Sequence, residues 1–155
     1  LQPDFADKRI QFFTSINPTI LPKFRINGFG AAAATAFPVF LPGEISLIKA
    51  EAYARASTPD LANSLLELEK VRTKLPAADP FGVGASLPAA VGPFTQVQLL
   101  DSIYKHRSIE LYMSGMKLED MRRFGRPTTE RKRNLMPYPL RERDNNPNTP
   151  LDPPF

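Results

Sequence analysis

The sequence predicts a mainly α-helical fold of tetratricopeptide-like helical hairpins, with long irregular proline-rich loops and an extended C-terminal tail. The chain has 155 residues, 42% of them hydrophobic, which is enough for one packed core. Its 17 prolines are about twice the usual share of ~5%. They leave two proline-poor windows with helical periodicity, 43–75 and 94–125. The segments expected to be irregular are 1–42, 76–93 and 126–155.

The first window opens with a helix expected from Gly43 to Ala56. Ile45, Ile48 and Ala52 follow the spacing of one helical face, which we expect to point inward. Glu51 and Arg55 stand four residues apart, in the favourable order for a surface ion pair.

A second helix is expected to start at Pro59 and to end near Lys74. Thr58 is the expected N-cap, and Pro59 suits the first helical position. A short turn joins the two helices, so they should lie antiparallel as a hairpin of roughly 34 residues, the length of one tetratricopeptide-like unit. The inward stripe should contain Leu61, Leu65 and Leu68.

A third helix begins at a predicted capping box, formed by Thr95 and Gln98. Gly115 should interrupt it, and a short helix from Lys117 to Phe124, ended by Gly125, should follow as the second member of a pair. The linker 76–93 has small residues without periodicity, so we expect a mobile loop. The inward stripe of the third helix should contain Leu99, Leu100, Ile103, Arg107 and Leu111.

The composition excludes several kinds of functional site. The chain has no Cys, which excludes disulfides, thiol catalysis and Cys-ligated zinc or iron–sulfur centres. It has one His, too few for a His-based metal site or a Ser-His-Asp triad. We therefore expect no cofactor and no metal. Because Leu1 replaces a starting Met, we expect that the chain begins after a cut.

Positive charge is concentrated near the C-terminus. The net charge is +4, but residues 117–143 alone carry nine basic and four acidic side chains, a balance of +5. A run such as Arg131-Lys132-Arg133 attracts phosphate or an acidic partner. A solvated surface is the more common explanation, and no groove-reading motif points to nucleic acid.

Few residues suggest a catalytic site. Glu44 and Glu51 lie two helical turns apart, at the far end of the separation that a carboxylate pair needs for sugar hydrolysis. His106 stands between two cations, which disfavours a metal. Arg107 and Glu110 are expected to form a structural ion pair, within reach of Arg72. These groups more often hold an architecture together than act on a substrate.

Aromatic residues are abundant in the N-terminal part, and aromatic faces also stack on sugar rings. Packing onto the helices is their default role. Gly28 and Gly30 resemble a phosphate-binding loop only superficially, because no Lys-Ser/Thr follows. The aromatic residues in question are Phe12, Phe13, Phe24, Phe29, Phe37 and Phe40.

Several blocks of the sequence match the motifs of one protein family. The first helix, GEISLIKAEAY, resembles "AE-x-x-L-x-x-AEA", and Val71-Arg72 resembles "N-x-V-R" at the end of the next helix. Residues 103–125 resemble "I-x-x-ER-x-x-EL-x-x-EG-x-R-x-x-D-L-x-R-x-G". The residues in register there are Arg107, Glu110, Leu111, Gly115, Asp120, Arg123 and Gly125.

Two further blocks lie near the ends. Residues 134–148 resemble "L-x-P-I-P-x-x-E-x-x-x-NPN" with Glu142 and Asn146-Pro147-Asn148 in place, and Asp7-Lys8-Arg9 with Lys23-Phe24 is similar to "DPR…KY". These motifs are those of the SusD/RagB family. The departures are Leu41 for Arg, Glu69 for Asn, His106 for Glu and Ser114 for Glu.

This resemblance implies a fold, a location and a function. Family members are several hundred residues long, so residues 1–155 would be the single C-terminal helical portion of a larger protein. They are lipid-anchored on the outer-membrane surface of Gram-negative bacteria, with the anchor on the missing N-terminal part. They bind oligosaccharides or other nutrients, cap a TonB-dependent transporter barrel and are not enzymes. Their ligand contacts come largely from upstream loops, so no ligand-binding residue is assigned here.

The function expected from the sequence is therefore passive nutrient capture, with a TonB-dependent transporter as partner. The chief rival is a tetratricopeptide-like module that binds another protein. A third hypothesis is an enzyme that uses Glu44 or Glu51 as a catalytic carboxylate. The Arg107–Glu110–Arg72 set would hold the helices rather than a sugar, and the proline-rich tail around Pro137–Pro139 would clamp both helical pairs.

Overall fold

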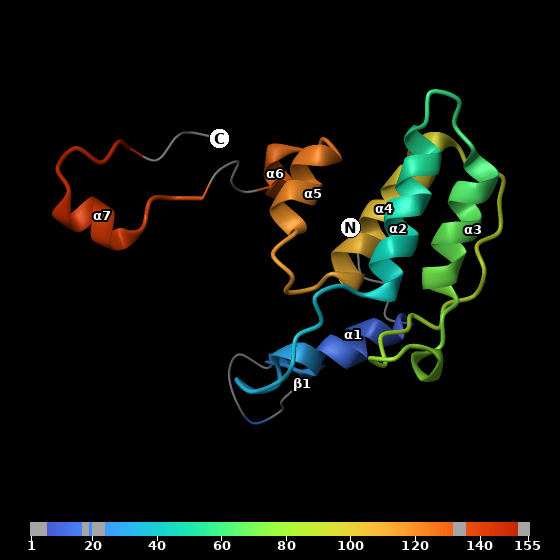
Figure 1. The fold of residues 1–155 in the computed structure, drawn as a ribbon, viewed down its shortest axis with the longest axis horizontal. Helices are drawn as coiled ribbons and strands as arrows, with labels where there is room; N and C mark the ends of the chain where they lie inside the picture. The colour runs from blue at the N-terminus through green and yellow to red at the C-terminus, as the bar shows by residue number, and fades with distance from the viewer. Residues whose placement is uncertain (1–5, 17–18, 20–23, 132–135, 152–155) are drawn as a thin grey trace. The chain divides into compact units, whose positions relative to one another are not determined.

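The computed structural model describes residues 6–16, 19, 24–131 and 136–151 (Figure 1). The chain divides into two compact units, Leu1–Gly115 and Met116–Phe155. Helices dominate both, so the predicted mainly α-helical fold is confirmed. The helices are α1 (Lys8–Phe13), α2 (Pro42–Arg55), α3 (Leu61–Arg72), α4 (Gln96–Glu110), α5 (Lys117–Arg123), α6 (Thr128–Arg131) and α7 (Leu140–Asn145).

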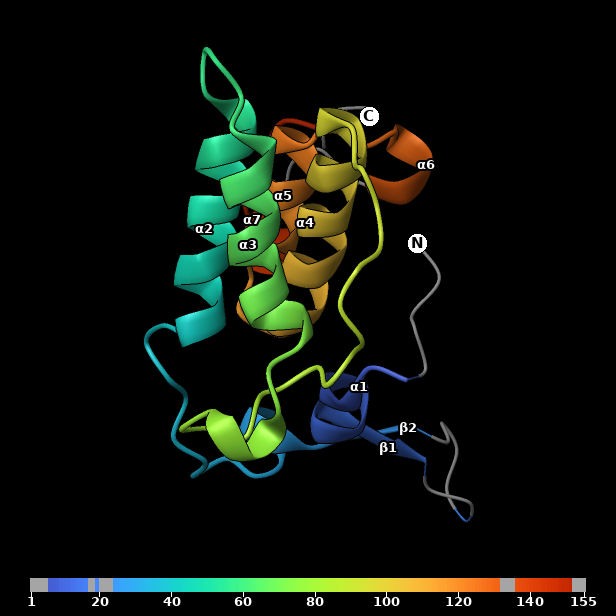
Figure 2. The same ribbon diagram turned by 90° about the vertical axis from the view of Figure 1, so that its right-hand side faces the viewer.

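Helices α2 and α3 form the predicted antiparallel hairpin and lie beside α4 in both views (Figures 1 and 2). Ala50 and Ala54 are fully buried, and the Ser64 hydroxyl donates to the Ala50 carbonyl across 2.8 Å. The predicted cap at Thr58 is wrong. Asp60 caps α3, because its carboxylate accepts from the Asn63 amide at 3.0 Å and the helix starts after it.

The inward face of α2 differs from the prediction. Leu47, Ala50 and Ala54 are buried, whereas Ile45 and Ile48 are 42% and 49% exposed. The helix carries apolar residues on two faces, so periodicity alone could not choose between them. The alanine face was selected because small side chains let the neighbouring helices approach closely.

The predicted start of α4 and its predicted inward-facing residues are confirmed. Thr95 and Gln98 form the capping box, and Leu99, Ile103 and Leu111 are buried. The Gln96 side-chain amide donates to the Ala54 carbonyl at 2.7 Å, which places the start of α4 at the end of α2. The helix ends at Glu110, and the chain then turns up to Gly115, whose φ of +84° favours glycine.

The linker 76–93 is a loop, as predicted, but it is packed rather than mobile. Val83 and Ala85 are fully buried. The Leu87 amide donates to the Arg72 carbonyl at 2.8 Å, and the Ser86 amide to the Lys74 carbonyl at 2.9 Å. The sequence lacked periodicity here because the segment packs through individual small residues and backbone hydrogen bonds, not through a repeating face.

The N-terminal part is more regular than the predicted irregular chain. Helix α1 is capped by Asp7 and leads into strand β1 (Thr14–Ile16), which pairs antiparallel with β2 (Phe24–Ile26). Thr14 pairs with Ile26 in this register. A six-residue helix and three-residue strands are too short to show a clear period. Lys23 lies outside the described residues.

Aromatic rings fix this part to the helical layer. Phe13 is 4% exposed and belongs to a core cluster with Leu41, Val83 and Leu111. Its ring centroid lies 5.0 Å from that of Phe12 and 5.5 Å from that of Tyr112, which follows α4. Phe12, Phe13 and Phe29 therefore pack as expected, whereas Phe37 and Phe40 remain 50% and 60% exposed. The Phe24 side chain lies outside the described part of the chain.

The second unit contains α5, α6 and α7. Helix α5 occupies the predicted segment, and Gly125 follows it with a φ of +60°. The tail is not extended throughout, because 128–131 and 140–145 are short helices. Lys132, Arg133, Asn134 and Leu135 lie outside the described residues. The clamp around Pro137–Pro139 stays a prediction.

Replacing Gly84 tests the packing of the 76–93 loop. A Cβ at Gly84 would lie 2.4 Å from the Pro76 nitrogen and 2.5 Å from the Leu75 carbonyl carbon, both backbone atoms that cannot move aside alone. We expect Gly84→Ala to lower the free energy of unfolding by about 1–3 kcal/mol, measured in urea. The exposed Ala89→Gly change is the control. Equal stability of Gly84→Ala and wild type would mean that the loop is loose.

Candidate functional site

Segments distant in the sequence meet at the Glu110 carboxylate near the end of α4. Its Oε2 accepts from Arg9 Nη1 at 2.9 Å, and its Oε1 accepts from Lys74 Nζ at 3.1 Å. Arg9 and Glu110 are separated by 101 positions, and both side chains are 0% exposed. This one carboxylate therefore ties α1 and the end of α3 to α4.

Arg9 is also held by Asp7, its neighbour in the helix cap. The Asp7 carboxylate accepts from Arg9 Nε at 3.0 Å and from Nη2 at 2.6 Å, a bidentate pair. Burial alone would lower the pKa of Arg9, but the hydrogen bonds and charges of Asp7 and Glu110 outweigh it and raise that pKa. The guanidinium is thus a permanent buried cation between two carboxylates.

His106 occupies the other side of the same guanidinium. Its Nδ1 lies 2.6 Å from Arg9 Nη2, and because arginine can only donate, Nδ1 must be the acceptor and Nε2 carries the proton. The 3.5 Å approach of Arg72 Nη1 to Nε2 then joins two donors and is not a hydrogen bond. Burial, helped by the charges of Arg9, Arg72 and Lys105, lowers the pKa of His106 to about 2.

Lys74 and Asp79 extend the cluster, and neither was predicted as a site residue from the sequence. Lys74 Nζ lies 2.6 Å from Asp79 Oδ2, while Asp79 Oδ1 accepts from the amides of Phe81 at 2.9 Å and Val83 at 3.1 Å. An Asp at the start of a Pro- and Gly-rich turn is a common turn former, and this was the available signal. Asp79 therefore connects the packed loop to Glu110 through Lys74.

The start of α2 also reaches Glu110. A Cβ at Gly43 would come within van der Waals overlap of Glu110 Oε1, so only glycine fits there. The positive end of the α2 dipole favours a carboxylate at that place. The described partners of Glu110 are Arg9 and Lys74, which helical spacing could not indicate. The predicted Arg107–Glu110 pair stays a prediction. Arg72 lies at the edge of the cluster, with Nη1 3.5 Å from His106 Nε2, and pairs with Glu69 at 3.0 Å. Its predicted contact with Arg107 and Glu110 stays a prediction.

This buried ion network has the properties of a structural element. Its central charges are excluded from water, and removing one partner of such a cluster typically costs about 3–5 kcal/mol. Both oxygens of the buried Glu110 carboxylate already accept hydrogen bonds, one from Arg9 and one from Lys74. The network can hold segments in place, but it offers no free acid or base for catalysis.

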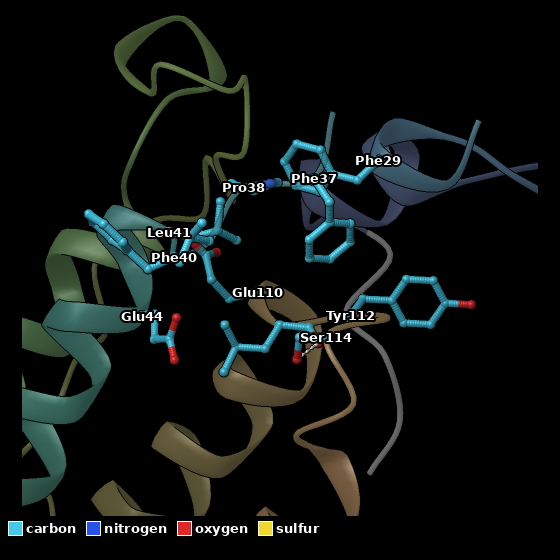
Figure 3. Close-up of a pocket in the computed structure, with 11 residues that line it drawn as sticks. Phe29, Phe37, Pro38, Phe40, Leu41, Glu44, Glu110, Tyr112 and Ser114 are labelled. Atoms are coloured by element: carbon cyan, nitrogen blue, oxygen red, sulfur yellow. Dashed lines mark hydrogen bonds between the residues drawn. The ribbon is translucent and has the colours of Figure 1, made fainter. Parts of the chain in front are cut away.

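An aromatic pocket lies beside the network (Figure 3). Its volume is about 40 Å³. Figure 3 shows Glu44 reaching from the first turn of α2 toward α4, with Phe40 above it and Phe37 farther along the pocket beside Phe29. Glu110 forms part of the wall. The lining residues are Phe29, Phe37, Pro38, Val39, Phe40, Leu41, Glu44, Glu110, Leu111, Tyr112 and Ser114.

A second hollow of about 190 Å³ lies between α1 and the last turns of α4. Its lining is mostly apolar. The Thr14 hydroxyl donates to the Ile10 carbonyl, and the Ser108 hydroxyl to the Tyr104 carbonyl, each within its own segment. Pockets that select a ligand need polar groups to orient it, so this hollow is the weaker candidate.

Of the remaining candidates, only Glu44 belongs to one of these sites. Glu51 is 5% exposed and accepts from Arg55 at 2.7 Å, so the predicted pair forms, although it is partly buried. Glu44 is the only one of the two carboxylates that lines the pocket. Gly28 and Gly30 belong to a 3₁₀ turn packed against Phe12 and Ile26. In the basic stretch, Arg126 pairs with Glu130 at 2.8 Å.

The described residues contain neither a cluster of metal-binding side chains nor a membrane-spanning helix. Within the part of the chain that the structure describes, no group of three or more His, Cys, Asp or Glu side chains is arranged to hold a metal ion. No helix among those same residues has both the length and the apolar sequence that crossing a bilayer requires.

His106 should make the stability of the chain depend on pH. In the folded chain the pKa of His106 is lowered from 6.5 to about 2, so below pH 6.5 the unfolded chain binds more protons than the folded chain. The free energy of unfolding therefore decreases as the pH is lowered below 6.5. The loss is at most about 1.4 kcal/mol per pH unit. His106→Asn keeps an acceptor for Arg9 but cannot titrate, so its stability should be flat between pH 6.5 and about pH 5, above the usual carboxylate range.

Urea unfolding at several pH values measures this slope. The chain has only one His, so no other imidazole contributes. Parallel slopes for wild type and His106→Asn would show that His106 titrates normally in the folded state.

Comparison with known protein families matches residues 30–150 to the SusD family. The match covers more than half of the chain, including α2, α3, α4 and α5. Comparison with curated proteins and with solved structures gave no match. The SusD family is known for binding nutrients without catalysing a reaction, and for association with the outer membrane. The chain belongs to the SusD family.

Proposed function

We propose that this chain is the C-terminal portion of a non-catalytic protein that binds oligosaccharides at the outer-membrane surface. The observation that carries the proposal is the SusD family match over residues 30–150. Residues 1–155 would form the helical part of the larger protein. Its lipid anchor would lie on the part upstream of Leu1.

The aromatic pocket agrees with this proposal. Phe37 and Phe40 are half-exposed beside a carboxylate, and flat apolar rings next to hydrogen-bond acceptors are suited to a sugar ring. The pocket is bordered by Glu110, which the ion network holds in one position. A fixed wall reduces the entropy lost on binding, so capture needs no chemical step.

We further propose that a TonB-dependent transporter is the partner that receives the nutrient. A tetratricopeptide-like protein interaction module is the alternative, and the exposed Ile45 and Ile48 on α2 favour it because exposed apolar side chains at helical spacing can form an interface. The two functions predict different partners.

Affinity purification from the native cells distinguishes them. With the protein tagged and the membranes solubilised in mild detergent, we expect a β-barrel transporter to co-purify in near-stoichiometric amount. The Gly84→Ala variant, whose fold should be weakened, is the control for nonspecific capture. Recovery of soluble partners alone would support the interaction module and reject the transporter partnership.

A further inference from the structure

The Glu44 carboxylate forms part of the wall of the aromatic pocket. It is partly buried, it lines the aromatic pocket, and within the described part of the chain its carboxylate has no hydrogen-bond or ion-pair partner. The nearby Glu51 and Glu110, by contrast, are both paired with cations. A partly desolvated carboxylate gains most from a charged donor.

The pocket has room for one small group. Its volume of about 40 Å³ exceeds the ~10–15 Å³ that one water needs, but it is far below the ~300 Å³ of a pocket that encloses a whole ligand. A ligand would therefore insert a single substituent, while its remaining part rests on the exposed Phe37 and Phe40 side chains.

Aromatic rings make a cation a suitable substituent. Phe29 and Phe37 lie with ring centroids 5.4 Å apart, and both line the pocket with Phe40. An ammonium group near an aromatic face gains about 0.5–2 kcal/mol, more as it loses water. A neutral hydroxyl group gains no such charge-based attraction from the rings.

The charge at the pocket itself has the matching sign. Of the two carboxylates that line it, Glu110 is paired with Arg9 and Lys74, while Glu44 keeps its negative charge. An acidic substituent at this place would therefore be repelled by Glu44.

We propose that this pocket binds an amine-bearing saccharide, with the ammonium group on Glu44 and the sugar ring against Phe37 and Phe40. This inference rests on the proposed function and names the substrate class. An acidic saccharide is excluded by the same charges that attract the amine.

Matched saccharides test the proposal by isothermal titration calorimetry. The probes are deacetylated chitotetraose, its fully N-acetylated form and cellotetraose, in mildly acidic buffer that protonates the amines. We expect the deacetylated tetramer to bind about tenfold more tightly than either neutral tetramer. Glu44→Gln should abolish that preference, and Phe40→Ala should weaken binding of the amine. Glu67→Gln, on α3 and outside the pocket, should leave the preference unchanged.

Each other outcome has a definite meaning. Equal affinity for the three tetramers, or a preference that survives Glu44→Gln, overturns this inference and leaves saccharide binding in place. Binding of none of the tetramers also overturns it, while the transporter test continues to judge the proposed function. Tighter binding of the tripeptide Ala-Lys-Ala than of the deacetylated tetramer would mean that the amine comes from a peptide, which rejects the saccharide.

Discussion

A buried carboxylate imposes the main constraint on this fold. Glu110 is fully excluded from water, and an unpaired charge in that position would cost several kcal/mol. The chain meets this requirement by bringing Arg9 from the N-terminal segment and Lys74 from the end of α3 to its two oxygens. The start of α2 approaches through Gly43, which has no side chain. Four distant segments are thereby fixed around one group.

Local patterns predicted the helices of this chain well. The Thr95 capping box, the Leu99 and Ile103 stripe and the stop at Gly125 depend on interactions within a few residues, which sequence spacing encodes. The inward face of α2 could not be predicted, because Ile45 and Leu47 are both apolar and only the neighbouring helices decide between them. Periodicity contains no information about neighbours.

The buried ion network could be predicted only in part. Arg9, Arg72 and Glu110 stood out through the family motifs, but nothing local pairs residues 101 positions apart. Lys74 and Asp79 carried no signal beyond a turn-forming composition. His106 stands where the family pattern has Glu, and the structure shows a neutral imidazole accepting from Arg9 there. An acceptor is therefore retained at that position without adding a fourth negative charge.

The network and the aromatic pocket share Glu110, which links the stability of the fold to the proposed binding site. The wall of the pocket is held by ion pairs that do not depend on a ligand, so the site is formed before the ligand arrives. Glu44 differs from Glu110 in having no such partner among the described residues. The structural carboxylate and the proposed binding carboxylate thus lie at one pocket with separate tasks.

The coupling between Arg9 and Glu110 tests the central claim most directly. A double-mutant cycle with Arg9→Met and Glu110→Gln, measured by urea unfolding, isolates the energy of their interaction. If the ion pair holds the N-terminal segment to α4, the two changes together should cost at least about 1 kcal/mol less than the sum of the single changes. Additive costs, within about 0.5 kcal/mol, would mean that the fold does not depend on this pair.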